Sequence, residues 1–386
     1  MTQTAPLNVL DELYLHLDRE DEPWSVHIEI RVEGRIDATR LRTAVRRAAL
    51  VHPIARASLT SARATDVRYR WEIAEKLTSI DLEEIECDGP ADLTRGRERL
   101  LSSSPELTTP GPFSLLLAHE REGDVVVMNL HHAAGDGLSA PALMSSIARA
   151  YAGEEDPLGT VDALEVRDVS AIAGSGSLKQ RISRGRAAVD YVTRGVSTPT
   201  RVAPQGGSDR PGYGFELLSF EPSELEQIGR LRTGGATIND VLLAGLAITV
   251  RRWNDQHDAD TGSIYLMMPI NLRPAEWRFE VIGNFASYVS VRLSAGQQST
   301  LQTAIKAAAA STRRIKDEGI SGLVVDMFDL PSALPTALKK RMQGLLPLTG
   351  NVLIDTAALS NLGRLPPAPG FRRRRGDPGC VVLTPR

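Results

Sequence analysis

The chain of 386 residues is 42% hydrophobic and 24% charged, with a formal net charge of −3 and a pI of about 6.2. These values indicate an ordinary globular protein of one large or two smaller domains, and they give no electrostatic reason to expect a nucleic-acid partner for the whole chain. No stretch is apolar enough to span a bilayer, the start lacks a signal-peptide pattern, and Cys87 and Cys380 have no metal or redox spacing, so we expect a cytoplasmic protein without disulfides.

In the first part of the chain, segments with the hydrophobic periodicity of strands alternate with segments that have the periodicity of helices. Apolar and polar residues alternate over 26–32, which predicts a half-buried strand, and helical spacing over 41–49 predicts a helix. Strands over 113–119 and 124–130 are expected to form a hairpin with its turn at 120–123. Weaker patterns predict a helix or turn at 7–18, strands within 68–86 and a short charged helix at 95–101.

The second hairpin strand runs directly into His131–Gly137, HHAAGDG, which we call the heptad loop. Neighbouring strand residues point to opposite faces, so only one of the two histidines can face a given site, and the other is architectural. The two glycines allow a sharp turn, and Asp136 between them can accept hydrogen bonds or meet a cation. Ser139 is expected to cap a helix over 139–151. The arrangement favours an active-site loop.

The heptad loop matches the signature H-H-x-x-x-D-G at all four fixed positions. In this respect the chain resembles the condensation-domain superfamily of acyltransferases. Members include chloramphenicol acetyltransferase, condensation domains of nonribosomal peptide synthetases, polyketide-associated acyltransferases and bacterial wax ester synthase/diacylglycerol acyltransferases, and the last two groups are the most similar in character. A buried core histidine or a His-x-x-x-Asp metal site are the alternatives, but neither explains the whole heptad, and no further histidine has ligand spacing. We therefore expect no metal.

Composition changes after the heptad helix. From 153 to 214 the chain is rich in Gly, Ser, Pro and charged residues, which is typical of a crossover between two halves, although 178–195 has a helix-like pattern. The Asn239-Asp240 pair either caps the following helix or contributes to a site. The second half is expected to contain strands at 215–220, 264–270, 288–293 and 355–362, and helices at 238–253 and 301–316.

The resemblance implies an α/β fold of two chloramphenicol acetyltransferase-like subdomains, each a mixed sheet flanked by helices, with a cleft between them. The expected boundaries are an N-terminal subdomain at 1–152, a crossover at 153–214, a C-terminal subdomain at 215–366 and a disordered tail at 367–386. The family pattern fails after Pro366, and four arginines follow at 372–375. We therefore expect the second subdomain to be incomplete and the activity to be affected.

The resemblance also implies the roles of individual residues. His132 would face the cleft and act as the general base that deprotonates an acceptor hydroxyl or amine, and Asp136 would pair with Arg273. The residues expected to support the loop are His131, Asp136, Gly137 and Arg273. The candidates for oxyanion or substrate contact are Ser360 and Asn361 in the family-like segment SNLG, together with Asn284.

The function expected from the resemblance is acyl transfer from a thioester without a permanently bound cofactor. The donor would be acyl-coenzyme A or an acyl group on the phosphopantetheine arm of an acyl or peptidyl carrier protein, and the acceptor a small molecule. The alternatives are a free-standing condensation enzyme that forms an amide and an inactive binding module. A serine hydrolase and a nucleotide-binding protein are disfavoured, because the sequence has neither a Gly-x-Ser-x-Gly elbow nor a phosphate-binding glycine motif.

Overall fold

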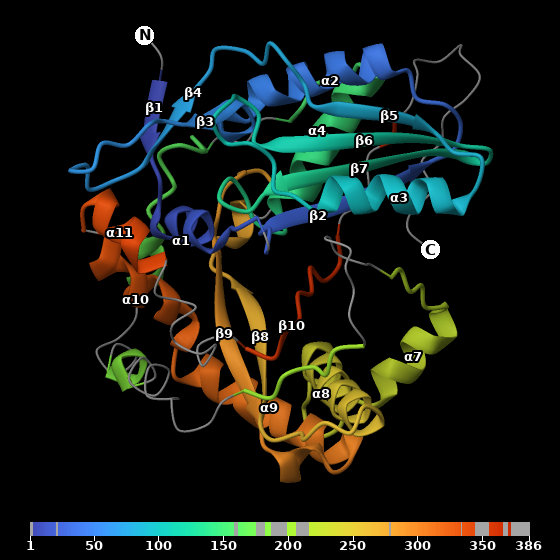
Figure 1. Cartoon of the computed structure of the whole chain (residues 1–386), viewed down its shortest axis with the longest axis vertical. Coiled ribbons are helices and arrows are strands. Elements are labelled where there is room, and N and C mark those ends of the chain that lie inside the picture. The colour runs from blue at the N-terminus through green and yellow to red at the C-terminus, as the bar shows by residue number, and fades with distance from the viewer. Residues whose placement is uncertain are drawn as a thin grey trace.

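The fold is described by a computed structural model. It describes residues 3–20, 22–157, 161–174, 182–186, 199–205, 216–277, 279–332, 334–343, 355–365 and 370–371. These residues form two halves, each a mixed or antiparallel sheet flanked by helices, one above the other in Figure 1. The predicted α/β class is thereby confirmed, while the expected subdomain boundaries and the cleft stay predictions.

The N-terminal half is built on a four-stranded sheet in the order β2-β7-β6-β5. Strands β2 (Ser25–Val32) and β6 (Phe113–Glu120) run antiparallel to β7 (Gly123–His131), and β5 (Leu82–Glu86) runs parallel to β6. The hairpin turn needs Gly123, which has a φ of +138° and whose added Cβ would overlap a backbone carbonyl of β2. Because β7 is a central strand with a neighbour on each side, its last residue is held firmly.

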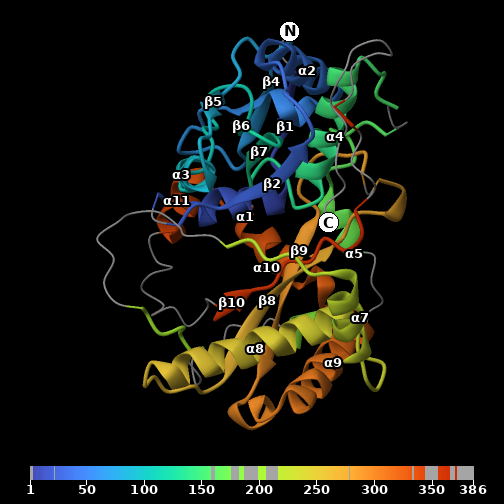
Figure 2. The same cartoon turned by 90° about the vertical axis from the view of Figure 1, so that its right-hand side faces the viewer.

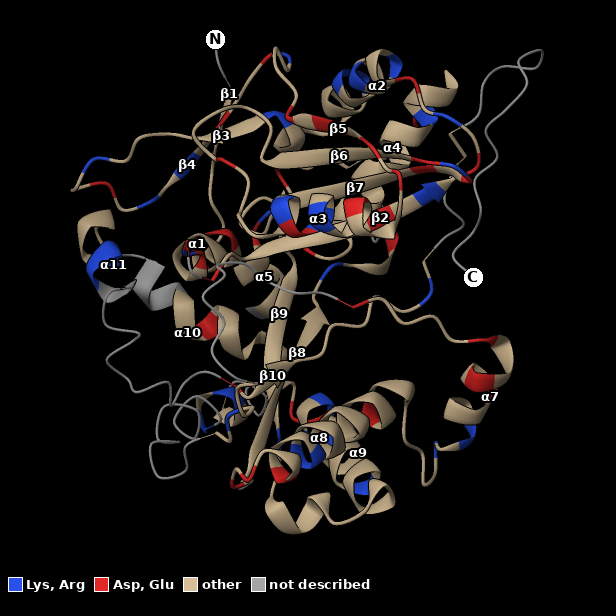
Figure 3. Ribbon diagram, turned by 45° about the vertical axis from the view of Figure 1, so that its right-hand side comes forward, with Lys and Arg blue, Asp and Glu red and all other residues tan. Residues whose placement is uncertain are grey.

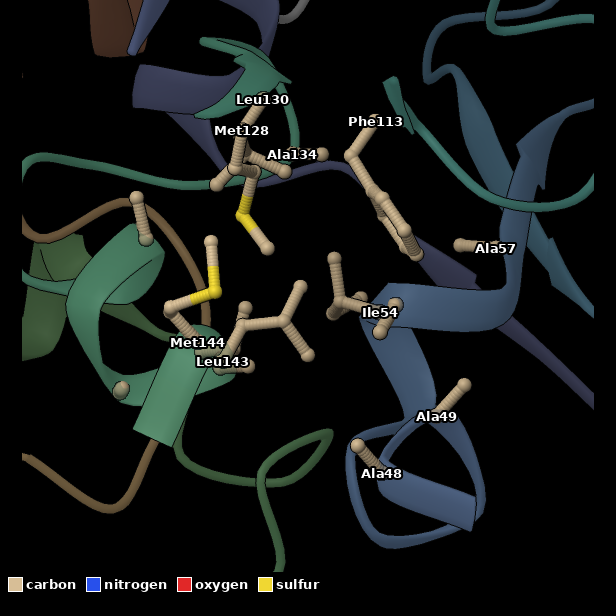
Figure 4. Packing of buried hydrophobic residues seen from close by; sticks show 14 of the residues in the cluster. Ala48, Ala49, Ile54, Ala57, Phe113, Met128, Leu130, Ala134, Leu143 and Met144 are labelled. Atoms are coloured by element: carbon tan, nitrogen blue, oxygen red, sulfur yellow. The ribbon is translucent and has the colours of Figure 1, made fainter. Parts of the chain in front are cut away.

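Helices cover both faces of this sheet, and its two central strands, β6 and β7, are almost entirely buried. Helices α2 (Ala38–Val51) and α4 (Ser139–Ala152) pack together over one face, and α3 (Pro90–Leu101) covers the other (Figure 1). Successive residues of β7 divide between the two: Val126 and Met128 join the large core, whereas Val125 and Val127 join the cluster under α3. Figure 4 shows the large core next to the heptad loop. Its labelled members include Ile54, Phe113, Met128, Leu130, Ala134, Leu143 and Met144.

A small second sheet flanks the N-terminal half, in the order β1-β4-β3. Its strands are β1 (Gln3–Pro6), β4 (Arg70–Ile73) and β3 (Ala57–Leu59). Short 3₁₀ helices among the described residues lie at Pro53–Arg56, Ala275–Trp277, Ala295–Gln298 and Ile320–Gly322. Figure 3 shows charges of both signs on α3 and α8 rather than one sign alone. No described helix has the length and apolarity needed to cross a membrane.

The C-terminal half contains a three-stranded sheet in the order β10-β8-β9. Strand β8 (Ile264–Asn271) pairs antiparallel with β9 (Ala286–Leu293) and parallel with the short β10 (Ala357–Ala358). Helices α8 (Ile238–Gln256) and α9 (Leu301–Asp317) pack against each other and against these strands, forming a separate core cluster. The capping box expected at the start of α8 is present and joins Thr237 to Asp240. Of the two roles considered for Asp240, the structure therefore supports helix capping.

The two halves are joined by helices and by the connection between β8 and β9. The helices between the sheets are α1 (Val9–Leu17), α5 (Val169–Gly174), α10 (Leu323–Ser332) and α11 (Thr336–Gln343), as Figures 1 and 2 show. Residues 272–285, which we call the β8–β9 connection, carry Val281, Ile282 and Phe285 into the large core of the N-terminal half. On α11, Lys339 Nζ lies 2.6 Å from Glu12 Oε2 of α1 in a buried ion pair. Residues from both halves therefore pack in the large core, while α8 and α9 keep their own cluster.

One strand prediction in the second half was wrong, and another strand is shorter than predicted. Residues 216–220 form no strand, and Leu217 and Leu218 are 58% and 81% exposed; helix α7 (Pro222–Arg230) follows without having been predicted. The strand expected at 355–362 is reduced to β10. A strand needs a partner edge, and the local sequence does not encode that partner.

Two further predictions fall partly outside the described residues. Part of the expected crossover is packed, since Val169 on α5 belongs to the large core, while most of the helix-like stretch 178–195 lies outside the described residues. The expected disordered tail also lies outside them, apart from Gly370 and Phe371. At Phe371 the expectation does not hold, because its side chain is fully buried with its ring 5.4 Å from that of Tyr151.

Candidate active site at the heptad loop

The heptad loop connects the end of β7 to the start of α4, as its sequence predicted. Neither Gly135 nor Gly137 adopts a positive φ. Glycine is required because a side chain would clash with neighbouring atoms. A Cβ on Gly135 would lie 2.8 Å from Ser139 Cβ, and one on Gly137 would lie 2.7 Å from Leu362 Cδ2. The loop is therefore shaped by close packing on both sides, and one of its neighbours comes from the SNLG segment.

Asp136 is the hydrogen-bond centre of the loop. Its Oδ1 accepts the backbone N–H groups of Leu138 and Ser139 at 3.1 Å, and its Oδ2 accepts the N–H of Phe285 at 3.0 Å. Asp136 therefore caps α4, and the expectation that Ser139 does so was wrong. The Ser139 hydroxyl lies within 3.0 Å of both Asp136 Oδ1 and the Gly283 carbonyl, and so links the loop to the β8–β9 connection.

Arg273 lies where the sequence analysis expected it. Its Nη2 donates to Asp136 Oδ1 and to the Gly283 carbonyl, both at 3.1 Å, and its guanidinium lies 4.7 Å from the centre of the Phe285 ring. Both charged side chains are almost fully buried. The pair stabilises the site only because each charge has a partner and additional hydrogen bonds, since an unpaired buried charge costs several kcal/mol.

His131 points into the N-terminal half. Its Nδ1 accepts the Ala133 N–H at 3.0 Å, so the ring proton is on Nε2, which lies 3.5 Å from Asp18 Oδ2. Burial alone would raise the pKa of the Asp18 carboxyl, but hydrogen bonds from His131, Ser104 and the Trp24 backbone outweigh it and lower the pKa. This geometry fits the architectural role expected for His131.

His132 lies on the opposite side, with its ring stacked on that of Tyr14 of α1. The ring centroids are 3.6 Å apart at an interplanar angle of 17°, and the Trp24 ring lies further away at 6.3 Å. The backbone is held at both ends, because its N–H donates to the Trp24 carbonyl at 3.0 Å and its carbonyl accepts from Asn284 Nδ2 at 2.6 Å. The side chain is therefore aimed by contacts from three different segments.

The environment of His132 keeps its imidazole neutral. Burial lowers the pKa of His132 to about 4; its own carbonyl, the Asp136 carboxylate and Asn284 act in the opposite direction but less strongly. Nδ1 is enclosed and has no hydrogen-bond partner among the described residues, while the residue as a whole is only half-buried. A neutral imidazole can accept a proton, which is the chemistry required of a general base.

Asn284 does not reach a substrate. It is fully buried, and its Nδ2 donates to the carbonyls of His132 and Ala133 at 2.6 and 3.0 Å and lies 3.2 Å from Asp11 Oδ1. With both amide hydrogens used inside the protein, Asn284 has none left for a substrate. The residue holds the heptad loop instead.

Ser360 and Asn361 are both exposed. Asn361 Nδ2 lies 2.5 Å from Asn239 Oδ1, and its own Oδ1 accepts the backbone N–H two residues further on. The segment meets the heptad loop through Leu362, which lies against Gly137. The oxyanion or substrate role expected for Ser360 and Asn361 stays a prediction. Among the described residues, no three His, Cys, Asp or Glu side chains are grouped so that they could hold a metal ion.

Helix α1 contributes three side chains to the site that were not predicted from the sequence. Asp11, Tyr14 and Asp18 follow at helical spacing, and they contact Asn284, His132 and His131. The signal in the sequence was Asp11 on an otherwise apolar helical face, because such a face is normally buried and a buried carboxylate needs partners. What that signal lacked was any indication of where the partners lie in the chain.

Comparison with known proteins places the fold and the loop in context. The chain matches the Condensation domain family over residues 13–323. An uncharacterised protein of Mycobacterium tuberculosis is 38% identical over 387 positions, which cover all of this chain and 89% of the relative. Malformin synthetase of Aspergillus niger is 32% identical over 139 residues, 36% of this chain but 3% of that protein.

Solved structures show the same fold. The first condensation domain of the calcium-dependent antibiotic synthetase, in complex with a substrate analogue, superposes with a TM-score of 0.67 at 16% identity, covering 95% of this chain and 83% of that one. The condensation domain of the Monacolin K polyketide synthase MokA gives 0.60 at 14% identity, covering 94% and 78%. The finer similarity to wax ester synthases and polyketide-associated acyltransferases stays a prediction. With a family match over most of its length and a fold that agrees with it, the chain belongs to the condensation-domain family.

Proposed function

We propose that this protein is an acyltransferase of the condensation type, which transfers an acyl group from a thioester to an amine or hydroxyl with His132 as the general base. The observation that carries the proposal is the contrast between the two histidines. His131 uses both ring nitrogens inside the protein, whereas the His132 ring is neutral, half-buried and aimed by neighbours on both sides. Family membership supplies the class of reaction.

In the proposed step, His132 Nε2 takes the proton of the acceptor as the acceptor's nitrogen or oxygen attacks the thioester carbonyl carbon. The C–S bond then breaks, and the departing thiolate takes that proton from the imidazolium. The products are an amide or ester and a free thiol, and the histidine returns to its neutral form. Because acceptor and donor react directly, no acyl-enzyme forms.

The low pKa of His132 has two consequences for this step. It keeps the base neutral at any pH well above 4, but it also gives the ring little tendency to hold the proton. The imidazolium therefore needs stabilisation while it exists. The Asp136 carboxylate, which raises the pKa of His132, supplies part of that stabilisation.

The donor is proposed to be acyl-coenzyme A or an acyl group on the phosphopantetheine arm of a carrier protein, and the acceptor a small molecule. Amide formation between carrier-bound substrates is the second candidate. The 32% identity to part of malformin synthetase over 139 residues favours it. A binding module without activity is the remaining alternative, and the experiment below separates all three.

The test is to follow thiol release from short, medium and long acyl-coenzyme A and from the same acyl groups on a phosphopantetheinylated carrier protein. Each donor is tested with free amine and alcohol acceptors and with an aminoacyl group bound to a second carrier protein. We expect release with at least one pair, and a fall in turnover by about 10² to 10⁴ in His132→Ala, the usual effect of removing a general base. His27→Ala is the matched control, because His27 is an exposed histidine on β2 and should leave turnover unchanged.

Each outcome decides between the candidates. Release from carrier-bound donors with amine acceptors alone favours the amide-forming enzyme. Near-normal turnover in a folded His132→Ala protein removes His132 from the role of base. No release with any donor and acceptor favours the binding module.

A further inference from the structure

The closest ring contact of the candidate site is made by Tyr14, which the proposed step does not use as a reactant. Its ring lies almost parallel to the His132 imidazole, with centroids 3.6 Å apart. The other ring pairs of Tyr14 and His132 are looser: Tyr14 and Trp24 are 5.8 Å apart at 38°, and Trp24 and His132 are 6.3 Å apart at 53°. One face of the imidazole is therefore covered by a single flat side chain.

Tyr14 is itself held in place by the segment that holds His132. Its hydroxyl donates to the Ala286 carbonyl at 3.2 Å, and Asn8 at the start of α1 donates to the Asn284 carbonyl at 3.1 Å. Asn284 in turn donates to the His132 carbonyl. Helix α1 and the heptad loop are thus tied to the same three-residue stretch, which fixes the stacked rings relative to each other.

We propose that Tyr14 is a positioning residue for His132, whose ring sets the plane of the imidazole and shields one of its faces from water. Its effect on turnover rests on the proposed function, while its effect on the histidine itself does not. A general base must be oriented toward the proton it takes, and small displacements of a positioned group cost large factors in rate.

The groups around His132 make Tyr14 the principal shield. Asp136 and His131 influence it electrostatically from its own loop, the uncharged amide of Asn284 contacts it from the β8–β9 connection, and the Trp24 ring lies at an angle to it. Burial, followed by the nearby Asp136 carboxylate, raises the pKa of Tyr14, so Tyr14 stays neutral wherever His132 titrates. A changed titration pH of His132 in a Tyr14 variant therefore reflects how the imidazole is shielded and oriented. It does not reflect ionisation of Tyr14.

An ordinary core tyrosine is the competing explanation. In that case the ring would fill space and its hydroxyl would satisfy the Ala286 carbonyl, with no effect on the histidine beyond stability. Tyr14→Leu and Tyr14→Phe separate the two roles. Leu keeps an apolar side chain but removes the flat face, while Phe keeps the face and removes only the hydroxyl.

The first measurement is the titration of His132 by NMR in protein labelled at histidine, with the His132 signal assigned from its loss in His132→Gln. We expect wild type and Tyr14→Phe to titrate close to pH 4, and Tyr14→Leu to titrate at least one pH unit higher, toward 6.5. Tyr14→Met is a second variant of the same kind if the Leu protein is poorly folded. An unchanged or lower titration pH in folded Leu or Met proteins overturns the proposal.

The second measurement is turnover. For Tyr14→Leu we expect kcat to fall about 10-fold with a smaller change in KM, and the acid limb of the pH–rate profile to move upward by the same interval as the NMR titration. Tyr14→Phe should keep kcat and the acid limb of the profile at their wild-type values. If the titration shifts while His132→Ala keeps full turnover, the proposed function fails and the positioning of the ring stands; if His132→Ala is inactive and the titration does not shift, only the positioning fails.

Discussion

Replacing Asp136 by Ala should be among the most disruptive single changes in the N-terminal half. The side chain pairs with Arg273 and accepts the N–H groups of Leu138, Ser139 and Phe285. Its loss leaves a buried guanidinium without an anion, which typically costs about 3–5 kcal/mol. We expect the free energy of unfolding to fall by this amount and the Tm to fall by roughly 5–10 °C.

A double-mutant cycle isolates the ion pair from the other hydrogen bonds. Arg273→Met keeps much of the side-chain volume, and in the double variant neither buried charge remains. We expect the double variant to be less destabilised than the sum of the single variants by about 1–3 kcal/mol in urea unfolding. The exposed pair Arg35–Glu86 is the control, because solvent screens it and little coupling is expected there. Losses at Asp136 and Arg273 that add within about 0.5 kcal/mol would mean that the two residues do not interact.

Gly137→Ala should lower the free energy of unfolding by about 1–3 kcal/mol, because the new Cβ would lie 2.7 Å from Leu362 Cδ2. Adding Leu362→Ala should recover part of this loss. If Gly137→Ala costs the same with and without Leu362→Ala, the contact between the two residues is not the cause. Burial lowers the pKa of His52 and of His132 to about 4. The unfolded chain therefore binds protons below about pH 6.5 before the folded chain does, so stability falls as the pH drops from 6.5 to 4 and levels off below that. Each histidine should contribute on the order of 3 kcal/mol to this loss. Urea unfolding between pH 7.5 and 4.5 measures the slope, and a stability that rises toward pH 4.5 would refute it.

The parts of the fold that the sequence revealed are those governed by short-range pattern. The hairpin of β6 and β7, helix α8 with its cap and the heptad loop follow from period and turn chemistry within a few residues. The pairing of Asp136 with Arg273 came from the resemblance to a family, and the structure brings the two together. Segment 216–220 shows the limit of local pattern, since a strand was expected there but its residues form none.

The parts of the site that the sequence did not reveal depend on contacts between distant residues. Tyr14 stacks on His132, and Asn284 is buried against a loop 152 positions earlier in the chain. The helical periodicity of α1 does not indicate which distant residues its polar side chains will contact. The opposite error, the substrate contact expected for Asn284, has the same origin, because a lone polar residue looks similar in sequence whether its partner is a ligand or a carbonyl.

The β8–β9 connection also sets the order in which a newly made chain can complete its site. The heptad loop leaves the ribosome well before its supports, since Asp136 and Phe285 are 149 positions apart. Until then Asp136 lacks the Arg273 guanidinium, the His132 carbonyl lacks the Asn284 amide, and the nascent N-terminal half is missing part of its core. Closing so long a loop is entropically slow, and exposed apolar surface in the interval favours aggregation. The N-terminal half thus carries His132 through much of synthesis before Asn284, one of the residues that hold it in place, exists.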